Sequence, residues 1–208
     1  VFDNTKFVLG DNSVLNLNAQ GNDIAFSNTK GDFRENIETS NTSEIYVKSD
    51  ERYKVSLDNV NHGTDENKGT LTVSGNAQIV AGGQDTYNNW ISGQVYVDKY
   101  TQTAGSKLTM ESNSTLNANT IKINDASVTL KNIAEGKNRD KTPKDGIKAK
   151  QSFTATGSTF TINNGTSKIE SDGSLEMNSS TIEIASGGVL GLSATNGVQL
   201  DKNTNITT

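Results

Sequence analysis

Short alternations of apolar and polar residues, each bounded by turn residues, recur along most of this chain. Residues 14–17, 121–123 and 160–162 are three examples. Alternation with a period of two places one face of a β-strand in a core and the other in water. Strands this short do not pair stably alone, and the links between them are too short for the helical crossovers of an ordinary parallel sheet. The pattern therefore predicts a repeated β-structure in which each strand pairs with its copy in the next repeat.

The repeat length follows from look-alike segments. Strands recur about every ten residues and similar units about every twenty, as in a solenoid. A Gly-Ser motif opens residues 105–110, 157–162 and 173–177, and residues 120–123 resemble residues 181–184, which lie 61 positions further on. That separation is consistent with three repeats of about twenty residues. We therefore predict an all-β fold, a right-handed parallel β-helix.

The inward and outward residues of this fold follow from the same alternation. We expect Ile121 and Ile123, and likewise Ile182 and Ile184, to point into the axis of the solenoid. The residues between them, Lys122 and Glu183, are expected to face water.

Composition agrees with a narrow core. Only 31% of the 208 residues are hydrophobic and 6% are aromatic, whereas an ordinary globular domain has about 45% apolar residues. Disorder is the first alternative, but it requires high net charge and few β-branched residues. The net charge is only −5, and Val, Ile and Thr recur throughout.

Several absences bear on compartment and partners. The chain has no cysteine, so we expect stabilisation by stacked strands, or an advantage in crossing a membrane unfolded. It has no apolar run of about 18 residues, so no membrane-spanning helix is predicted in this segment. The acidic balance argues against a nucleic-acid partner. Without an initiator methionine or signal segment, Val1 and Thr208 are expected to be cut points inside a longer protein.

We expect a single β-helical segment over residues 1–208, interrupted by four insertions. These insertions are residues 28–44, 61–69, 83–93 and 131–151. Insertions in a solenoid project as loops from one face, where binding specificity is commonly built. The last insertion is rich in basic residues and includes Lys137, Arg139 and Lys141.

The third insertion contains the most ligand-like cluster, Tyr87, Asn88, Asn89 and Trp90, followed by Tyr96 and Tyr100. An aromatic ring beside amide groups suits a sugar, because the ring covers C–H groups and the amides bond hydroxyls. The alternative is that Trp90 caps the core beneath its own loop. The predicted ligand-binding residues are Tyr87, Asn88, Asn89, Trp90, Lys137, Arg139 and Lys141.

The chemistry of known catalytic and metal sites is hard to find in this chain. His62 is the only histidine and no Gly-x-Ser-x-Gly elbow occurs, which argues against a serine hydrolase. The Gly-Gly-x-Gly-x-Asp calcium repeat is missing. We therefore predict that the protein is not an enzyme and that it has no catalytic residue, metal or cofactor.

A carbohydrate-active enzyme, a lyase or glycosidase using carboxylates on the solenoid surface, remains the alternative. Its candidate groups are Asp65, Glu66, Asp125, Glu170 and Asp172. Thr-x-Thr pairs also occur, but their irregular spacing favours ordinary threonine ladders over an ice-binding face.

Residues 100–110, Tyr-Thr-Gln-Thr-Ala-Gly-Ser-Lys-Leu-Thr-Met, resemble the Tyr-Thr-Gln-Thr-Ala-Gly-Ser-x-Leu-x-hydrophobic run of Gram-negative autotransporter passengers (type V secretion). Residues 114–130 and 152–192 are similar to passenger repeats in general. The resemblance implies a β-helical stalk that is exported through the outer membrane and lies extracellularly or on the cell surface. Many passengers are adhesins or aggregation factors, while others are proteases, esterases or toxins.

The expected function is adhesion or cell–cell aggregation through the loops and polar faces. The expected partners are a host surface glycan or protein, or a second passenger by self-association. The remaining alternatives are a carbohydrate-active enzyme and a fragment of a β-helical toxin passenger.

Overall fold

The computed structural model describes residues 93–111, 114–131 and 146–208, and outside these ranges only the strands named below. All of the described elements are strands, without a helix among them. They form a thirteen-stranded sheet and an eight-stranded sheet, both with parallel pairing, and a two-stranded antiparallel pair. The all-β class predicted from the sequence is confirmed.

Within the described strands, the pairing resolves into three ladders of eight members each. The first ladder contains β1 (Phe2–Asp3), β4 (Ile24–Ser27), β7 (Val55–Ser56), the first halves of β12 (Gly93–Gln102), β14 (Ser114–Asn124) and β16 (Ile147–Thr156), then β18 (Gly165–Ser171) and β21 (Gly188–Ala194).

The second ladder belongs to the same sheet. It contains β2 (Phe7–Leu9), β5 (Ile37–Thr39), β8 (Thr70–Val73), the second halves of β12, β14 and β16, then β19 (Ser174–Asn178) and β22 (Val198–Leu200).

The third ladder is the eight-stranded sheet. It contains β3 (Val14–Ala19), β6 (Glu44–Ser49), β9 (Gln78–Ala81), β13 (Lys107–Met110), β15 (Ser127–Leu130), β17 (Thr159–Ile162), β20 (Thr181–Ile184) and β23 (Asn205–Thr207).

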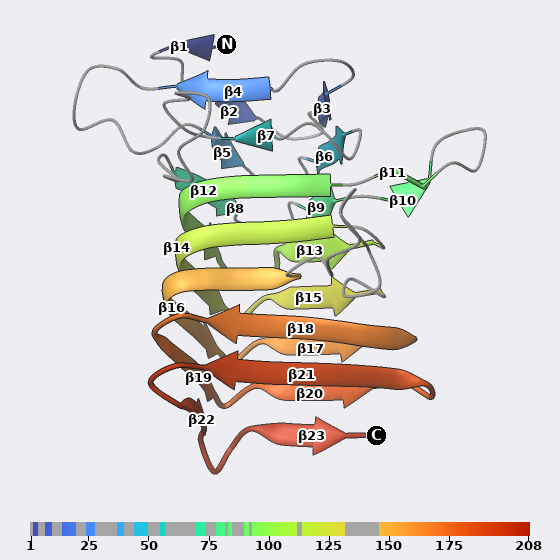
Figure 1. Cartoon of the computed structure of the whole chain (residues 1–208), viewed down its shortest axis with the longest axis vertical. Coiled ribbons are helices and arrows are strands. Elements are labelled where there is room, and N and C mark those ends of the chain that lie inside the picture. Colours follow the sequence, from blue (N-terminus) through green and yellow to red (C-terminus); the bar gives the residue numbers. More distant parts are fainter. Residues whose placement is uncertain are drawn as a thin grey trace.

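The chain visits the three ladders in a fixed order, and we call one such visit to all three a circuit. Figure 1 shows the circuits stacked along the long axis, with the two termini at opposite ends. Where no insertion intervenes, a circuit is 20 to 24 residues long: Lys107 pairs with Ser127, Thr159 with Thr181, and Ile182 with Ile206. This agrees with the repeat of about twenty residues expected from the sequence.

The core lies between the ladders and consists of apolar columns, one residue from each circuit. Leu108, Val128, Phe160 and Ile182 form one column of the third ladder, and each is 2% exposed or less. Parallel pairing in register puts like residues directly above one another, so each circuit covers the apolar face of the next.

The predicted orientation of the isoleucine pairs is confirmed for three of the four residues. Ile121, Ile123 and Ile182 are buried, and Lys122 and Glu183 are exposed. Ile184 is only partly buried and packs against the core.

Two of the predicted repeat equivalences are wrong. Residues 120–123 lie on the second ladder in β14, whereas residues 181–184 form β20 on the third. Residues 173–177 likewise lie on the second ladder, while 105–110 and 157–162 are equivalent on the third. All three ladders require the same apolar alternation and similar turn residues, so sequence similarity alone cannot separate one ladder from another.

Ranges predicted as insertions contain several described strands. β5 lies within 28–44, and the first residues of β16 lie within 131–151. β10 (Gly83–Gln84) and β11 (Trp90–Ile91) lie within 83–93 and pair antiparallel, apart from the three ladders.

The register measures the length of one insertion directly. Four to six residues separate the end of the third ladder from the first ladder in three links: Glu111 to Leu116, Asn163 to Ile169 and Ala185 to Leu192. Fifteen residues separate the equivalent Lys131 and Ile147. The link from the third ladder to the first therefore contains about ten extra residues between Lys131 and Ile147.

Candidate functional site

The residues predicted to bind a ligand lie mostly outside the described part of the chain. This applies to Tyr87, Asn88, Asn89, Lys137, Arg139 and Lys141. Trp90 begins β11, where its backbone pairs with Gln84. Their role as a ligand site stays a prediction.

Tyr100 was expected to extend this aromatic cluster, and that expectation is wrong. The side chain is only 1% exposed and stacks between Leu71 and Ile121 in the second ladder. Its hydroxyl donates to Gln102 Oε1 at 3.1 Å, and Gln102 Nε2 donates to the carbonyls of Ser106 and Ser127. Burial raises the pKa of the Tyr100 hydroxyl, which keeps it protonated as a donor.

The corner between the second and third ladders is a structural feature that the sequence reading missed. The residue two positions before each third-ladder strand has a positive φ in four circuits, at Gly105, Asp125, Gly157 and Ser179. The next residue points inward and carries a hydroxyl in most circuits. We call Ser106, Ser158, Ser180 and Thr204 the corner hydroxyls.

Corner hydroxyls link one circuit to the next. The amide of Ala126 donates to Ser158 Oγ at 3.3 Å, the amide of Ser158 to Ser180 Oγ at 3.4 Å, and the amide of Ser180 to Thr204 Oγ1 at 3.3 Å. Each hydroxyl also donates to a backbone carbonyl, as Ser158 does to Thr156 at 2.9 Å. The repeated Gly-Ser at 105–106 and 157–158 was the sequence signal for this chain of bonds.

Replacing Ser158 by alanine is expected to destabilise the fold by about 1–3 kcal/mol, because the buried amide of Ala126 loses its acceptor. The matched control is Ser167→Ala. Ser167 Oγ is also buried but has no hydrogen-bond partner among the described protein atoms, so its removal should leave stability unchanged or raise it. Urea unfolding measures both variants. Equal losses of unfolding free energy in the two variants would contradict the role of Ser158 Oγ as the acceptor for the amide of Ala126.

Asp201 closes this corner at the last circuit. Its Oδ1 accepts from the amide of Ser179 at 2.9 Å and from Thr204 Oγ1 at 2.8 Å. These bonds, the amide of Ser179 first, lower the pKa of the carboxyl from its ordinary 3.8.

A carboxyl with a lowered pKa in the folded state stabilises the fold above its unfolded pKa, and loses that contribution as the pH falls through the lowered value. We therefore expect the unfolding free energy of the wild type to exceed that of Asp201→Asn near pH 7, and this gap to shrink below about pH 4. Urea unfolding at a series of pH values measures the gap. A gap that is independent of pH would rule out this role for Asp201.

The outer face of the third ladder presents a column of threonines. Thr109, Thr129 and Thr161 occupy the same register position in three consecutive circuits, followed by Glu183. Thr161 Oγ1 donates to Glu183 Oε2 at 3.3 Å. This column is interrupted by a charge, so it agrees with an ordinary threonine ladder rather than an extended ice-binding face.

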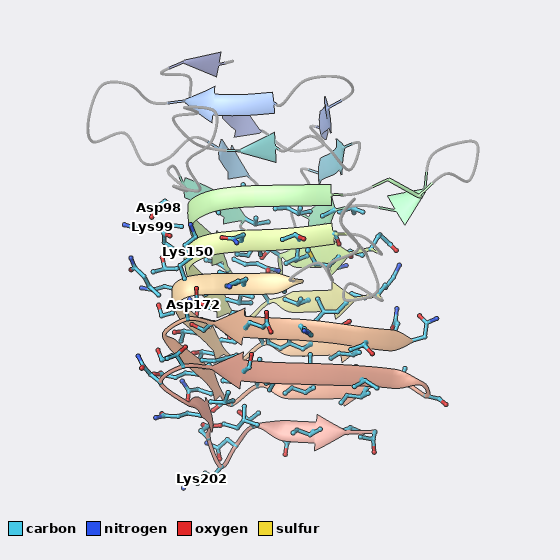
Figure 2. All side chains as sticks on the ribbon, in the orientation of Figure 1. Asp98, Lys99, Lys150, Asp172 and Lys202 are labelled. Carbon is cyan, nitrogen blue, oxygen red and sulfur yellow. The ribbon has the colours of Figure 1, made fainter. Side chains whose placement is uncertain are left out.

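The outer face of the first ladder, with the corner that leads from it to the second ladder, is charged with both signs. Lys148 lies 3.4 Å from Asp172, Lys168 lies 3.9 Å from Glu170, and Asn119 donates to Asp98 at 2.7 Å. Figure 2 shows Asp98, Lys99, Lys150 and Asp172 along one side of the stack, and Lys202 at its lower end.

Glu170 and Asp172, the candidate catalytic carboxylates of the alternative enzyme function, are thus each beside a lysine. Asp125 occupies a positive-φ corner position and is exposed, and Asp65 and Glu66 lie outside the described residues.

Two further observations concern the described residues only. They contain no group of three or more His, Asp or Glu side chains placed to hold a metal ion. They also contain no helix long and apolar enough to cross a membrane.

In comparisons with protein-family models, curated proteins and solved structures, nothing matches the chain.

Proposed function

We propose that the chain is a right-handed parallel β-helix, in which each circuit is one coil, and that it acts as an exported surface stalk for adhesion or cell–cell aggregation. The observation that carries this proposal is the set of three parallel ladders in register, with apolar columns inside and polar columns outside. Stacked coils give a long polar surface, and solenoids use such surfaces for binding.

The segment that resembles autotransporter passengers supports the architecture. Tyr100, Gln102 and Ser106 form the buried network described above, Gly105 has φ of 81°, and Leu108 and Met110 are buried. The motif thus consists largely of residues that build the corner between the second and third ladders. It supports a shared coil architecture, while the particular activity has to come from surface residues.

Two surfaces support the binding role. The outward columns of the first and third ladders carry Lys, Glu, Thr and Asn side chains that can bond sugar hydroxyls or charged protein groups. The extra residues between Lys131 and Ile147 enter at one corner of the stack and include the predicted binding residues Lys137, Arg139 and Lys141.

The strand bounds decide which residues of this insertion can be replaced without damage to the fold. Removal of residues 131–151 would delete the first residues of β16, so the test replaces only residues 132–145, which leaves β15 and β16 whole. One variant carries four residues, which together with Gly146 give a link of five residues, the length that joins Asn163 to Ile169. A second variant keeps the length of the native segment and carries fourteen Gly and Ser residues.

We expect the chain, displayed on a non-adherent bacterium, to increase settling or attachment to host cells, and both variants to reduce that effect. Circular dichroism of the purified variants checks that the strands remain. A displayed native chain that leaves settling and attachment at the level of the empty strain would contradict the proposal. Release of products from uronate or neutral glycans by the purified chain would favour the carbohydrate-active enzyme instead.

A further inference from the structure

Basic residues are concentrated in the middle of an acidic chain. Residues 99–151 carry ten basic and five acidic residues, whereas residues 1–98 and 152–208 together carry nine basic and nineteen acidic residues. Charge of one sign gathered on part of a surface attracts ligands of the opposite sign to that part. The middle circuits are therefore the part of this protein that favours an anionic ligand.

Three lysines of this range lie on one side of the stack. Lys99 and Lys122 are exposed at outward positions of the second ladder, and Lys150 lies at the corner between the first and second ladders. They come from β12, β14 and β16, which are consecutive strands about 4.8 Å apart. Figure 2 shows Lys99 and Lys150 on the same side. We define the lysine face as these three lysines with the outward residues beside them: Thr101, Thr120, Ser152 and Thr154.

A β-bulge brings Lys150 to this face. Ala118 pairs with Ala149 and Thr120 with Ser152, so Asn119 alone opposes both Lys150 and Gln151. Bulges of this kind re-aim side chains and are frequent beside binding sites. The extra residue enters at the corner, where Lys150 is half-buried and Gln151 is exposed.

The carboxylates that border the lysine face have partners outside it. Asp98 Oδ1 accepts from Asn119 Nδ2 at 2.7 Å, and Asp172 lies 3.4 Å from Lys148 Nζ. Glu176 occupies the column of Lys122 one circuit after Thr154 and ends the face there. An anion on the lysine face thus meets lysines and hydroxyls before it meets a carboxylate.

The residue types of the face favour a polysaccharide over a protein. Its outward positions in β12, β14 and β16 hold only Lys, Thr and Ser. Protein interfaces are enriched in aromatic residues and Arg and depleted in Lys and Ser. Hydroxyl groups beside ammonium groups instead match a sugar chain, because they bond its hydroxyls while the ammonium groups bind its anionic groups.

We propose that the lysine face binds an acidic polysaccharide, whose carboxylate or sulfate groups lie against Lys99, Lys122 and Lys150. The inference rests on the proposed function, because it names the chemical class of glycan that the stalk holds. The binding assay below uses no cells. A chain that binds the polysaccharide without supporting adhesion therefore counts against the proposed function alone, and adhesion without polysaccharide binding counts against this inference alone.

Binding of the purified chain to immobilised polysaccharides tests the proposal. The probes are heparin, which carries sulfates and carboxylates, and polygalacturonate, which carries carboxylates only, with neutral dextran for comparison. We expect binding to the acidic probes and none to dextran, and an affinity that falls as salt is raised, because salt screens exposed charges. Binding to neither acidic probe at low salt would overturn the proposal.

A charge-matched pair of variants locates the site. Lys99→Gln, Lys122→Gln and Lys150→Gln in one chain should weaken binding at least about tenfold, and arginine at the same three positions should retain it, because the charge is kept. The control carries Lys107→Gln, Lys168→Gln and Lys202→Gln, which change the net charge equally but lie outside the lysine face. It should stay within about twofold of the wild type. Circular dichroism checks the fold of each variant. Equal losses of affinity in the two glutamine variants would contradict the assignment of the site.

A DNA duplex distinguishes a polysaccharide site from a general polyanion surface. The duplex is stiff, so it also meets the acidic circuits on either side of the face, and we expect it to bind more weakly than heparin. Equal or tighter binding of the duplex, lost in the same lysine variant, would overturn the proposal.

Discussion

Replacing Gly173 by alanine is expected to lower the unfolding free energy by at least about 3 kcal/mol. Gly173 lies between β18 and β19, and a Cβ built on it falls 1.7 Å from the carbonyl oxygen of Gln151 in the preceding circuit. Two hydrogen bonds hold the backbone of Gly173 in this position. The amide of Gly173 donates to Ser171 Oγ at 3.1 Å, and its carbonyl accepts from the amide of Asn196 at 2.9 Å.

The matched control for this change is Gly191→Ala in β21. A Cβ on Gly191 meets Lys168 Cγ at 3.6 Å and the carbonyl of Ser167 at 3.8 Å, which are ordinary contacts. We expect a change within about 0.5 kcal/mol, or a small gain from the reduced entropy of the unfolded chain. Urea unfolding measures both variants. If the two alanine variants lose the same unfolding free energy, consecutive circuits do not approach each other as closely at Gly173 as described.

Val128→Asp is the second change with a large expected effect, a loss of several kcal/mol. Val128 is fully buried, and its column neighbours are Leu108 and Phe160, so the carboxylate finds no polar partner among them. This position is a sharper test of the core than Ile123, because the buried amide of Gln102 pairs in register with Ile123.

Thr129→Asp is the control on the same strand. Thr129 points outward between Thr109 and Thr161, so the change should cost about 1 kcal/mol or less. Because each circuit contacts only its neighbours, hydrogen exchange in Val128→Asp should rise first in β13, β15 and β17. The opposite order, with Thr129→Asp the more damaging change, would mean that the register of the third ladder is shifted by one residue.

The alternation of residues was sufficient to predict strands, their inward faces and the length of a circuit. Ile121 and Lys122 show why: in a strand the side chains of consecutive residues point to opposite faces, so hydrophobicity alone orients them. The same rule holds on every ladder. It therefore carried no information on which ladder a strand belongs to, and residues 120–123 and 181–184 were paired wrongly.

The candidate binding site was predicted from residue types. Of the residues in and next to its aromatic cluster, only Tyr100 has a described side chain against which the prediction can be compared. An aromatic residue suits both a sugar platform and a core, and its neighbours in adjacent circuits decide between the two. For Tyr100 those neighbours are Leu71 and Ile121, with Gln102 as the partner of the hydroxyl. None of these contacts is local in sequence except that with Gln102.

The sequence by itself determined the all-β class, the period of a circuit and the inward position of Ile121, Ile123 and Ile182, because each depends on alternation within a few residues. Only the tertiary structure decided the three ladders, the corner hydroxyls and the close approach at Gly173. Those features arise between residues about 20 or more positions apart, where the stacking of whole circuits sets which groups meet.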